Sequence, residues 1–158
     1  MGRKFWCACG TYMFWVGDIA SSHTSQHLLD PYSFSHIQHG LLFAALLCWA
    51  KKPYLEIALL IEAGWEILEN TPLIIDRYRA ATASLNYYGD SILNSMGDLL
   101  SCAMGFYVAM RVPRSVSISL FIAIETVMVI VLRDSLLLNV IMLLYPLEAI
   151  KEWQMGSG

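Results

Sequence analysis

The chain has 158 residues, which is enough for one domain. Hydrophobic residues make up 57% of it and charged residues only 15%, whereas an average soluble domain has about 45–50% apolar and about 25% charged residues. Because the apolar residues are gathered into long blocks, the composition is typical of a membrane protein. The net charge is only −3 and no basic cluster lies beside aromatic residues, so a nucleic-acid partner is excluded.

The beginning of the chain differs from the rest. Its first apolar stretch, residues 12–16, is far shorter than the roughly 20 residues that a spanning helix needs. A polar stretch follows over residues 17–36, and the start lacks the apolar core of a signal peptide. We therefore expect residues 1–34 to form an interfacial or surface segment.

The four cysteines are too few and too scattered for a disulfide framework. Cys48 and Cys102 lie in apolar segments, where a buried thiol behaves as a small hydrophobic group. Cys7 and Cys9 form a Cys-x-Cys motif that could bind a metal, form a strained disulfide, or do neither. We favour the inert interpretation of this motif.

Four spanning helices are predicted, over residues 33–52, 54–70, 90–110 and 115–132. The first can be capped by the hydroxyl of Ser33 or Ser35, and two lysines followed by Pro53 end it. Between the second and third helices, residues 71–89 are expected to form a long ordered lid, because connections of this length are usually functional or disordered.

The last apolar segment, residues 136–153, contains Pro146 and has an amphipathic end. It either spans the membrane or kinks and lies along the interface, and we favour spanning. Residues 156–158 have the sequence of a cloning remnant and are left outside the predicted domain, residues 35–155.

The predicted fold class is therefore all-α: a polytopic membrane bundle of about four to five helices with an N-terminal interfacial segment. Its short loops carry Lys51 and Lys52 at one position and Arg111 and Arg114 at another. Short positive loops are cytoplasmic, so the opposite ends of the helices should face the periplasm from the bacterial inner membrane.

Ionisable residues recur within the apolar segments at helical spacing. They form one stripe on each of the first three helices: His36 and His39; Glu62, Glu66 and Glu69; and Asp90, Asn94 and Asp98. Three antiparallel helices bring such stripes to the same level. Because ionisable groups at membrane depth are costly, a functional site is the default interpretation.

Several carboxylates can share a site of low dielectric only if they are protonated, paired with arginines or bound to a cation. A divalent metal would be held by residues drawn from the three stripes: His36, His39, Glu62, Glu66, Asp90 and Asp98. The spacing lacks the repeated Glu-x-x-His pairs of di-iron bundles, so a metal-free acid and base pair remains an equal alternative. The third alternative is a polar network with a purely structural role.

In either functional alternative, the expected catalytic residues are Glu66, Glu62, His39 and Arg77. The expected substrate-binding residues are Arg79, Tyr78, Asn94 and His27, the last of which could join the site from the surface segment. A serine nucleophile at Ser25, beside His23 or His27, is only weakly indicated because such short spacings are common.

Long motifs resemble an uncharacterised family of small proteobacterial inner-membrane proteins. They are WCACG at 6–10, SSHTSQHLLDPYSFSHIQHG at 21–40, EAGWEILENTPLIIDRYRAATASLNYYGDSILNSMGD at 62–98 and RDSLLLNVIMLLYPLEAIKEWQ at 133–154. That family usually has one more hydrophobic segment before its Trp-Cys-x-Cys-Gly motif, so the resemblance implies that this chain is either truncated or a short form. It implies no activity.

More distantly, the order of polar residues is similar to that of the VanZ-like group of membrane proteins. The shared order is His39, Glu62 and Glu66, Arg77, and Asp90 with Asn94 and Gly97. The arginine and aspartate lie closer together in that group, so the likeness supports a bundle more than any chemistry.

We therefore expect a membrane-embedded enzyme with an outward-facing His/Glu/Asp site that acts on a lipid, lipid-linked or phosphate-bearing envelope substrate by hydrolysis or group transfer. The alternative is a non-enzymatic protein that binds an ion or small molecule, as a transporter or assembly factor. A structural partner of a larger membrane complex is a third interpretation. Membrane lipid is an expected partner in every case, and a homo-oligomer is compatible with each.

Overall fold

The computed structural model describes residues 2–49, 54–82 and 84–156, which contain seven helices and no named strand. The helices are α1 (Ser33–Trp49), α2 (Leu55–Glu69), α3 (Pro72–Ala81), α4 (Ile92–Arg111), α5 (Arg114–Leu132), α6 (Leu136–Leu144) and α7 (Glu148–Gln154). The prediction of an all-α fold is confirmed for this part of the chain.

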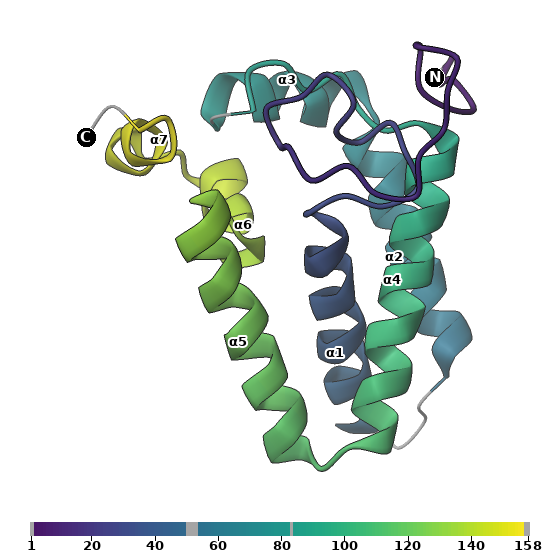
Figure 1. Ribbon diagram of the computed structural model, residues 1–158. Coiled ribbons are helices and arrows are strands. Elements are labelled where there is room, and N and C mark those ends of the chain that lie inside the picture. The colour runs from purple at the N-terminus through teal and green to yellow at the C-terminus, as the bar shows by residue number, and fades with distance from the viewer. Residues whose placement is uncertain (1, 50–53, 83, 157–158) are drawn as a thin grey trace.

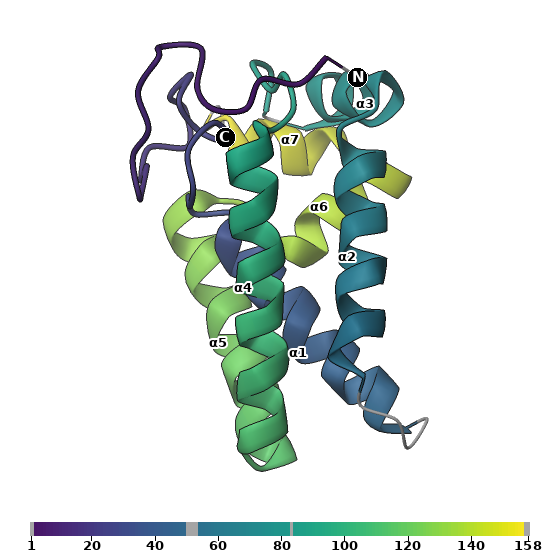
Figure 2. The same cartoon turned by 90° about the vertical axis from the view of Figure 1, so that its right-hand side faces the viewer.

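Four of these helices, α1, α2, α4 and α5, run up and down as a bundle (Figure 1). The short helices α3, α6 and α7 gather at one end of it, together with the irregular N-terminal segment, residues 2–32 (Figure 2). Arg111 and Arg114 lie at the opposite end, where α4 turns into α5. The bundle therefore has one covered end and one end formed by short turns.

Glycines allow α1 and α4 to pack closely. A Cβ atom added to Gly40 of α1 would lie 2.0 Å from the carbonyl oxygen of Cys102, and one added to Gly105 of α4 would lie 2.1 Å from that of Ile37. Small residues at such positions let helix backbones approach each other, as in membrane helix pairs. The two helices thus form the tightest contact of the bundle.

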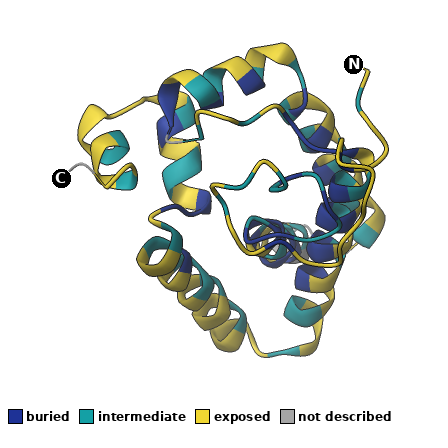
Figure 3. Ribbon diagram, turned by 45° about the horizontal axis from the view of Figure 1, so that its top comes forward, coloured by how far each residue is buried: buried dark blue, intermediate teal, exposed yellow. Residues whose placement is uncertain are grey.

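Two helices, α4 with 20 residues and α5 with 19, are long and apolar enough to cross a membrane. Only 6% of the apolar window of α5 is buried, so this helix exposes its hydrocarbon side chains along nearly its whole length. Figure 3 shows buried residues mainly on the inner sides of the helices. Helices α1 and α2 have 17 and 15 residues, and the predicted four to five spanning helices are not confirmed by these lengths.

Two predictions about the connecting segments are wrong. Residues 72–81 form a helix within the segment that was expected to be a long loop, and Pro72 suits the first turn, where a missing backbone N–H costs nothing. The last segment is broken at Tyr145 and Pro146 into α6 and α7. A nine-residue α6 is about 14 Å long and cannot cross a hydrocarbon layer of about 30 Å.

The N-terminal segment lies across the start of α4. The backbone N–H groups of Ile92 and Leu93 donate to the carbonyls of Lys4 and Phe5, at 3.0 and 2.9 Å. Ser91 caps α4 by accepting from the N–H of Asn94. The predicted orientation also rests on Lys51 and Lys52, which lie outside the described residues.

Candidate functional site

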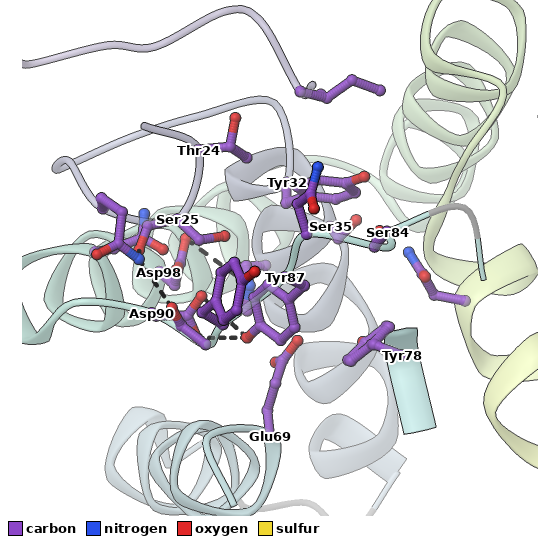
Figure 4. Close-up of a pocket in the computed structure, with 18 of the residues that line it drawn as sticks. Thr24, Ser25, Tyr32, Ser35, Glu69, Tyr78, Ser84, Tyr87, Asp90 and Asp98 are labelled. Atoms are coloured by element: carbon purple, nitrogen blue, oxygen red, sulfur yellow. Dashed lines mark hydrogen bonds and ion pairs between the residues drawn. The ribbon is translucent and has the colours of Figure 1, made fainter. Parts of the chain in front are cut away.

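A cavity of about 720 Å³ lies at the covered end of the bundle. Its walls come from the N-terminal segment, α1, α2, α3, the loop before α4, α4 and α6. Aromatic and polar side chains that line it include Tyr32, Trp65, Glu69, Tyr78, Tyr87 and Asp90 (Figure 4). A cavity with these walls can enclose the polar part of a small molecule.

Two histidines of α1 and one glutamate of α2 meet at the base of this cavity. Nδ1 of His36 lies 2.5 Å from Oε1 of Glu62, and Nδ1 of His39 lies 2.9 Å from its Oε2. Glu62 is completely buried. The HxxH spacing places both rings on one face of α1, so a single carboxylate bridges them.

Glu66, one turn further along α2, has a different environment. It is 5% exposed, and neither of its carboxylate oxygens has a hydrogen-bond partner among the described residues. Its nearest charged neighbour is His36, whose Nδ1 lies 3.5 Å from Oε1. Because a buried polar group without a partner is costly, this carboxylate requires a proton or a cation.

Two sets of side chains have ligand atoms within 4.8 Å of one another: His36 with His39 and Glu62, and His36 with Glu66 and Glu69. We call these five residues the His–Glu centre. Among the described residues, no lysine or arginine forms an ion pair with its carboxylates. Imidazole and carboxylate are suitable ligands for a divalent cation such as Zn²⁺.

The two predicted aspartate ligands occupy the margin of this centre. Asp98 accepts a hydrogen bond from Oγ of Ser33 and lies 3.8 Å from Nε2 of His36. Asp90 accepts from Nδ2 of Asn70 at 2.7 Å and from the hydroxyl of Tyr87 at 3.0 Å. Burial raises the pKa of the Asp90 carboxyl. Neither aspartate joins either set of metal ligands within the described residues.

The two arginines expected to face the substrate lie away from the cavity. Nε of Arg77 donates to the carbonyl of Leu143, and Arg79 lies over the ring of Tyr88 at 4.6 Å. In helix α3 the intervening Tyr78 faces the cavity, so its two neighbours are turned about 100° to either side. Their predicted position assumed a loop, whereas the helix fixes the directions of their side chains relative to Tyr78.

The remaining predicted substrate-binding residues differ in position. Tyr78 lines the cavity and packs edge to face against Tyr87. Asn94 also lines it, but its Nδ2 donates to the carbonyl of His27 at 2.9 Å. His27 is 1% exposed and is not among the residues of the cavity wall; its ring contacts His23 instead.

Several residues of the cavity were given no role in the predicted site. Glu69 belongs to the predicted stripe with Glu62 and Glu66, but it was not assigned as a ligand. Arg3 and Lys4 also line the cavity, and Arg3 donates from Nε to the backbone oxygen of Asp90 at 2.9 Å. This contact joins residues 87 positions apart, and no local pattern could have indicated it.

Comparison with known proteins gives one family. A family model described as "Protein of unknown function (DUF2585)" matches residues 1–156. A UPF0314 protein of Rhizobium etli (strain CIAT 652) is 52% identical over 161 residues, which cover 99% of this chain and 83% of the relative. A UPF0314 protein of Paracoccus denitrificans (strain Pd 1222) is 48% identical over 160 residues, which cover 98% of this chain and 82% of the relative.

A further UPF0314 protein, from Novosphingobium aromaticivorans, is 45% identical over 167 residues, which cover 99% of this chain and 84% of the relative. No solved structure matches the chain. The more distant likeness to the VanZ-like group is not shown by these comparisons.

Proposed function

We propose a function for this chain, which belongs to the proteobacterial family DUF2585, as its motifs predicted. The description of that family states no activity, so the proposal rests on the residues of this chain. The protein is a membrane-embedded enzyme of the bacterial inner membrane. It acts on a lipid, lipid-linked or phosphate-bearing envelope substrate by hydrolysis or group transfer, with a divalent cation held in the His–Glu centre.

The observation that carries this proposal is the environment of Glu66. Its two carboxylate oxygens are buried and lack hydrogen-bond partners among the described residues, while His36 and Glu69 offer further ligand atoms beside it. A structural network would satisfy these oxygens with donors, as Asn70 and Tyr87 satisfy Asp90. A proton or a cation would satisfy the Glu66 carboxylate, and the ligand atoms of His36 and Glu69 beside it favour the cation.

The centre has the groups that hydrolysis requires. A bound divalent cation lowers the pKa of a coordinated water and polarises a substrate oxygen. Glu62 holds the rings of His36 and His39 in position, and His39 is only partly buried, so it can exchange a proton with a molecule in the cavity. Arg3 and Lys4 supply positive charge to the same cavity for an anionic group.

The membrane setting is supported by the outer surface of the bundle. α5 exposes isoleucines along its length, for example Ile118, Ile122 and Ile130, and such a continuous apolar face suits contact with lipid. The turn with Arg111 and Arg114 lies opposite the cavity, so the positive-inside rule assigns the cavity to the periplasmic side. All four long helices would then lie in or along the bilayer.

The test compares Glu66→Gln with Glu125→Gln in purified full-length protein. Glu125 is a suitable control because its carboxylate has partners, the side chain of Gln38 at 2.9 Å and the N–H of Leu137 at 3.1 Å. We expect elemental analysis to find less divalent metal per chain in Glu66→Gln than in the wild type and in Glu125→Gln, because the substitution removes a ligand of the His–Glu centre.

Activity is followed by mass spectrometry after incubation with an inner-membrane lipid extract that contains lipid-linked phosphates. Products should form with the wild type and Glu125→Gln but not with Glu66→Gln. Equal product formation by both variants would contradict the proposed role of the centre. Metal binding without any turnover would favour the alternative function, a non-enzymatic membrane protein that binds a cation. Such a protein also agrees with the observation that no lysine or arginine in the described part of the chain pairs with the carboxylates of the centre.

A further inference from the structure

The N-terminal segment contains a second group of metal-ligating side chains, outside the cavity. Cys7, Cys9, His23 and His27 each offer one ligand atom, and these four atoms all lie within 4.8 Å of one another. We propose that they bind a zinc ion, which fastens the N-terminal segment in its place over the cavity. We call this group the Cys–His site; it does not depend on the proposed enzyme function.

Two of the six distances between the ligand atoms match those of a tetrahedral site, and all six are within 4.8 Å. Sγ of Cys7 lies 3.4 Å from Nδ1 of His23, and Nε2 of His27 lies 3.4 Å from the same nitrogen. Tetrahedral zinc with bonds of about 2.0–2.3 Å separates its ligand atoms by roughly 3.3–3.8 Å. The side chains therefore need little movement to accept the ion.

The Cys-x-Cys motif forms a turn that presents both sulfur atoms. The N–H of Cys9 donates to Sγ of Cys7 at 3.4 Å, and the N–H of Gly10 donates to the carbonyl of Cys7 at 3.1 Å. Gly10 has a φ of 79°, a backbone conformation that glycine adopts without strain. Both thiols are free, so the disulfide considered for this motif is not formed.

The histidines occupy unequal positions in the site. Nδ1 of His23 faces the other three ligands and can bind through its lone pair directly. Nδ1 of His27 accepts a hydrogen bond from the N–H of Met13 at 3.0 Å, which leaves the proton of the neutral ring on Nε2. Binding through Nε2 displaces that proton and costs the bond to Met13, so we expect His27 to contribute less than His23.

Two thiolates and two imidazoles select zinc over the hard cations Ca²⁺ and Mg²⁺, which prefer oxygen. Three of the four ligands are at least partly buried, whereas Cys9 is exposed and leaves a way for the ion to enter. Each thiol loses a proton when it binds, so the affinity increases with pH.

A zinc ion at this position would join the two parts of the N-terminal segment. The part before Cys7 is bound to the start of α4 through the carbonyls of Lys4 and Phe5. The part after His23 is bound to α4 through the carbonyl of His27, which accepts from Asn94. The described residues between these anchors contain no helix, and short irregular segments commonly depend on a metal for stability.

The test is cobalt substitution in the full-length protein, kept reduced in detergent and first stripped of metal with a chelator. Tetrahedral Co²⁺ with thiolate ligands gives a charge-transfer band in the near ultraviolet, which the carboxylates and imidazoles of the His–Glu centre cannot produce. We expect this band in the wild type and in Glu66→Gln. Cys7→Ser and His23→Asn should weaken Co²⁺ binding at least tenfold, and His27→Asn should weaken it less.

Cys102→Ser is the matched control, because Cys102 is a buried thiol of α4 outside the Cys–His site, and this variant should keep the band.

A second measurement is cleavage by chymotrypsin at the exposed Tyr12 and Phe14. Zn²⁺ should slow this cleavage in the wild type but not in Cys7→Ser. Absence of the band in the wild type, or its persistence in a Cys7→Ser/Cys9→Ser double variant, would overturn the proposal. Melting curves of the metal-free proteins show whether each variant is folded.

Discussion

Glu66 and Asp90 are both buried carboxylates, and their surroundings lead to opposite expectations for stability. Glu66 is without hydrogen-bond partners among the described residues, whereas Asp90 accepts from Asn70 and Tyr87. Removing the charge of a buried, unpaired carboxylate relieves a desolvation cost. Removing the Asp90 acceptor costs the Asn70 amide one of its two hydrogen bonds and leaves the partly buried Tyr87 hydroxyl without this acceptor, and a fully buried unpaired donor costs about 1–3 kcal/mol.

In metal-free protein, Glu66→Gln should therefore leave the melting temperature unchanged or raise it. Asp90→Ala should lower it, by roughly 2–4 °C for each kcal/mol lost at this chain length. Thermal unfolding followed by circular dichroism in detergent measures both. A clear decrease for Glu66→Gln would indicate that Glu66 belongs to a structural network instead of a cation site.

Asp134, between α5 and α6, makes stability depend on pH. It is 6% exposed and accepts hydrogen bonds from Tyr32, Ser135 and Gln154. Burial raises its pKa from 3.8 to about 6. The folded state therefore retains a proton that the unfolded state has released, so stability is full below pH 3.8 and decreases as the pH rises to about 6.

The expected decrease is on the order of 3 kcal/mol for a shift of this size. Asp134→Asn keeps an acceptor oxygen but cannot ionise, so it should lose none of this stability. The melting temperature of Asp134→Asn minus that of the wild type should increase between pH 4 and pH 6 and stay constant above. A difference that does not change over this range would show that Asp134 is charged in the folded protein at low pH.

At the scale of helices, Gly40 and Gly64 give a direct test of close packing. A Cβ atom at Gly40 would lie 2.0 Å from a backbone oxygen of α4, whereas nothing lies within 4 Å of one at Gly64 in α2. Gly40→Ala should destabilise the protein by at least the 1–3 kcal/mol typical of overpacking. Gly64→Ala should stabilise it by about 0.5–1 kcal/mol, because alanine favours a helix. Equal melting temperatures for the two variants would contradict the α1–α4 contact.

Periodicity predicted the long helices and the polar stripes because both depend on residues three or four positions apart. As that spacing implies, the two polar groups come together in the structure: Glu62 and Glu66 of α2 lie beside His36 and His39 of α1. The helix α3 was missed because Asp76, Arg77 and Arg79 give it no apolar periodicity, although Pro72 was a signal for a helix start.

The position of the N-terminal segment could not be predicted because long-range contacts fix it. Its anchors pair the carbonyls of Lys4, Phe5 and Ser25 with backbone N–H groups at the start of α4. Backbone atoms are the same in every residue, so no sequence pattern marks such pairs. The Cys–His site depends on the same contacts, which is why the Cys-x-Cys motif alone led us to favour the inert interpretation.

For the whole molecule, the proposed orientation can be tested by cysteine labelling. Leu85, near the cavity, and Ser115, in the first turn of α5, lie at opposite ends of the bundle, and both are exposed. In intact cells, and in protein whose four native cysteines are replaced by serine, a membrane-impermeant maleimide should label Leu85→Cys and leave Ser115→Cys unlabelled until the membrane is opened. Labelling of both positions from the same side would exclude a bilayer between them.

The anchoring of residues 2–32 on α4 also determines the order of events during synthesis. Arg3 is made 87 residues before its partner Asp90, and Gln26 is made 63 residues before Gly89. At translation rates of about 5–20 residues per second, these partners appear on the order of ten seconds apart. The N-terminal segment leaves the ribosome well before α4 and is therefore among the last segments to reach its native position. During that interval the thiol of Cys7, only 5% exposed in the finished protein, is open to oxidants, and thiol reagents should modify it in nascent chains that end before residue 90.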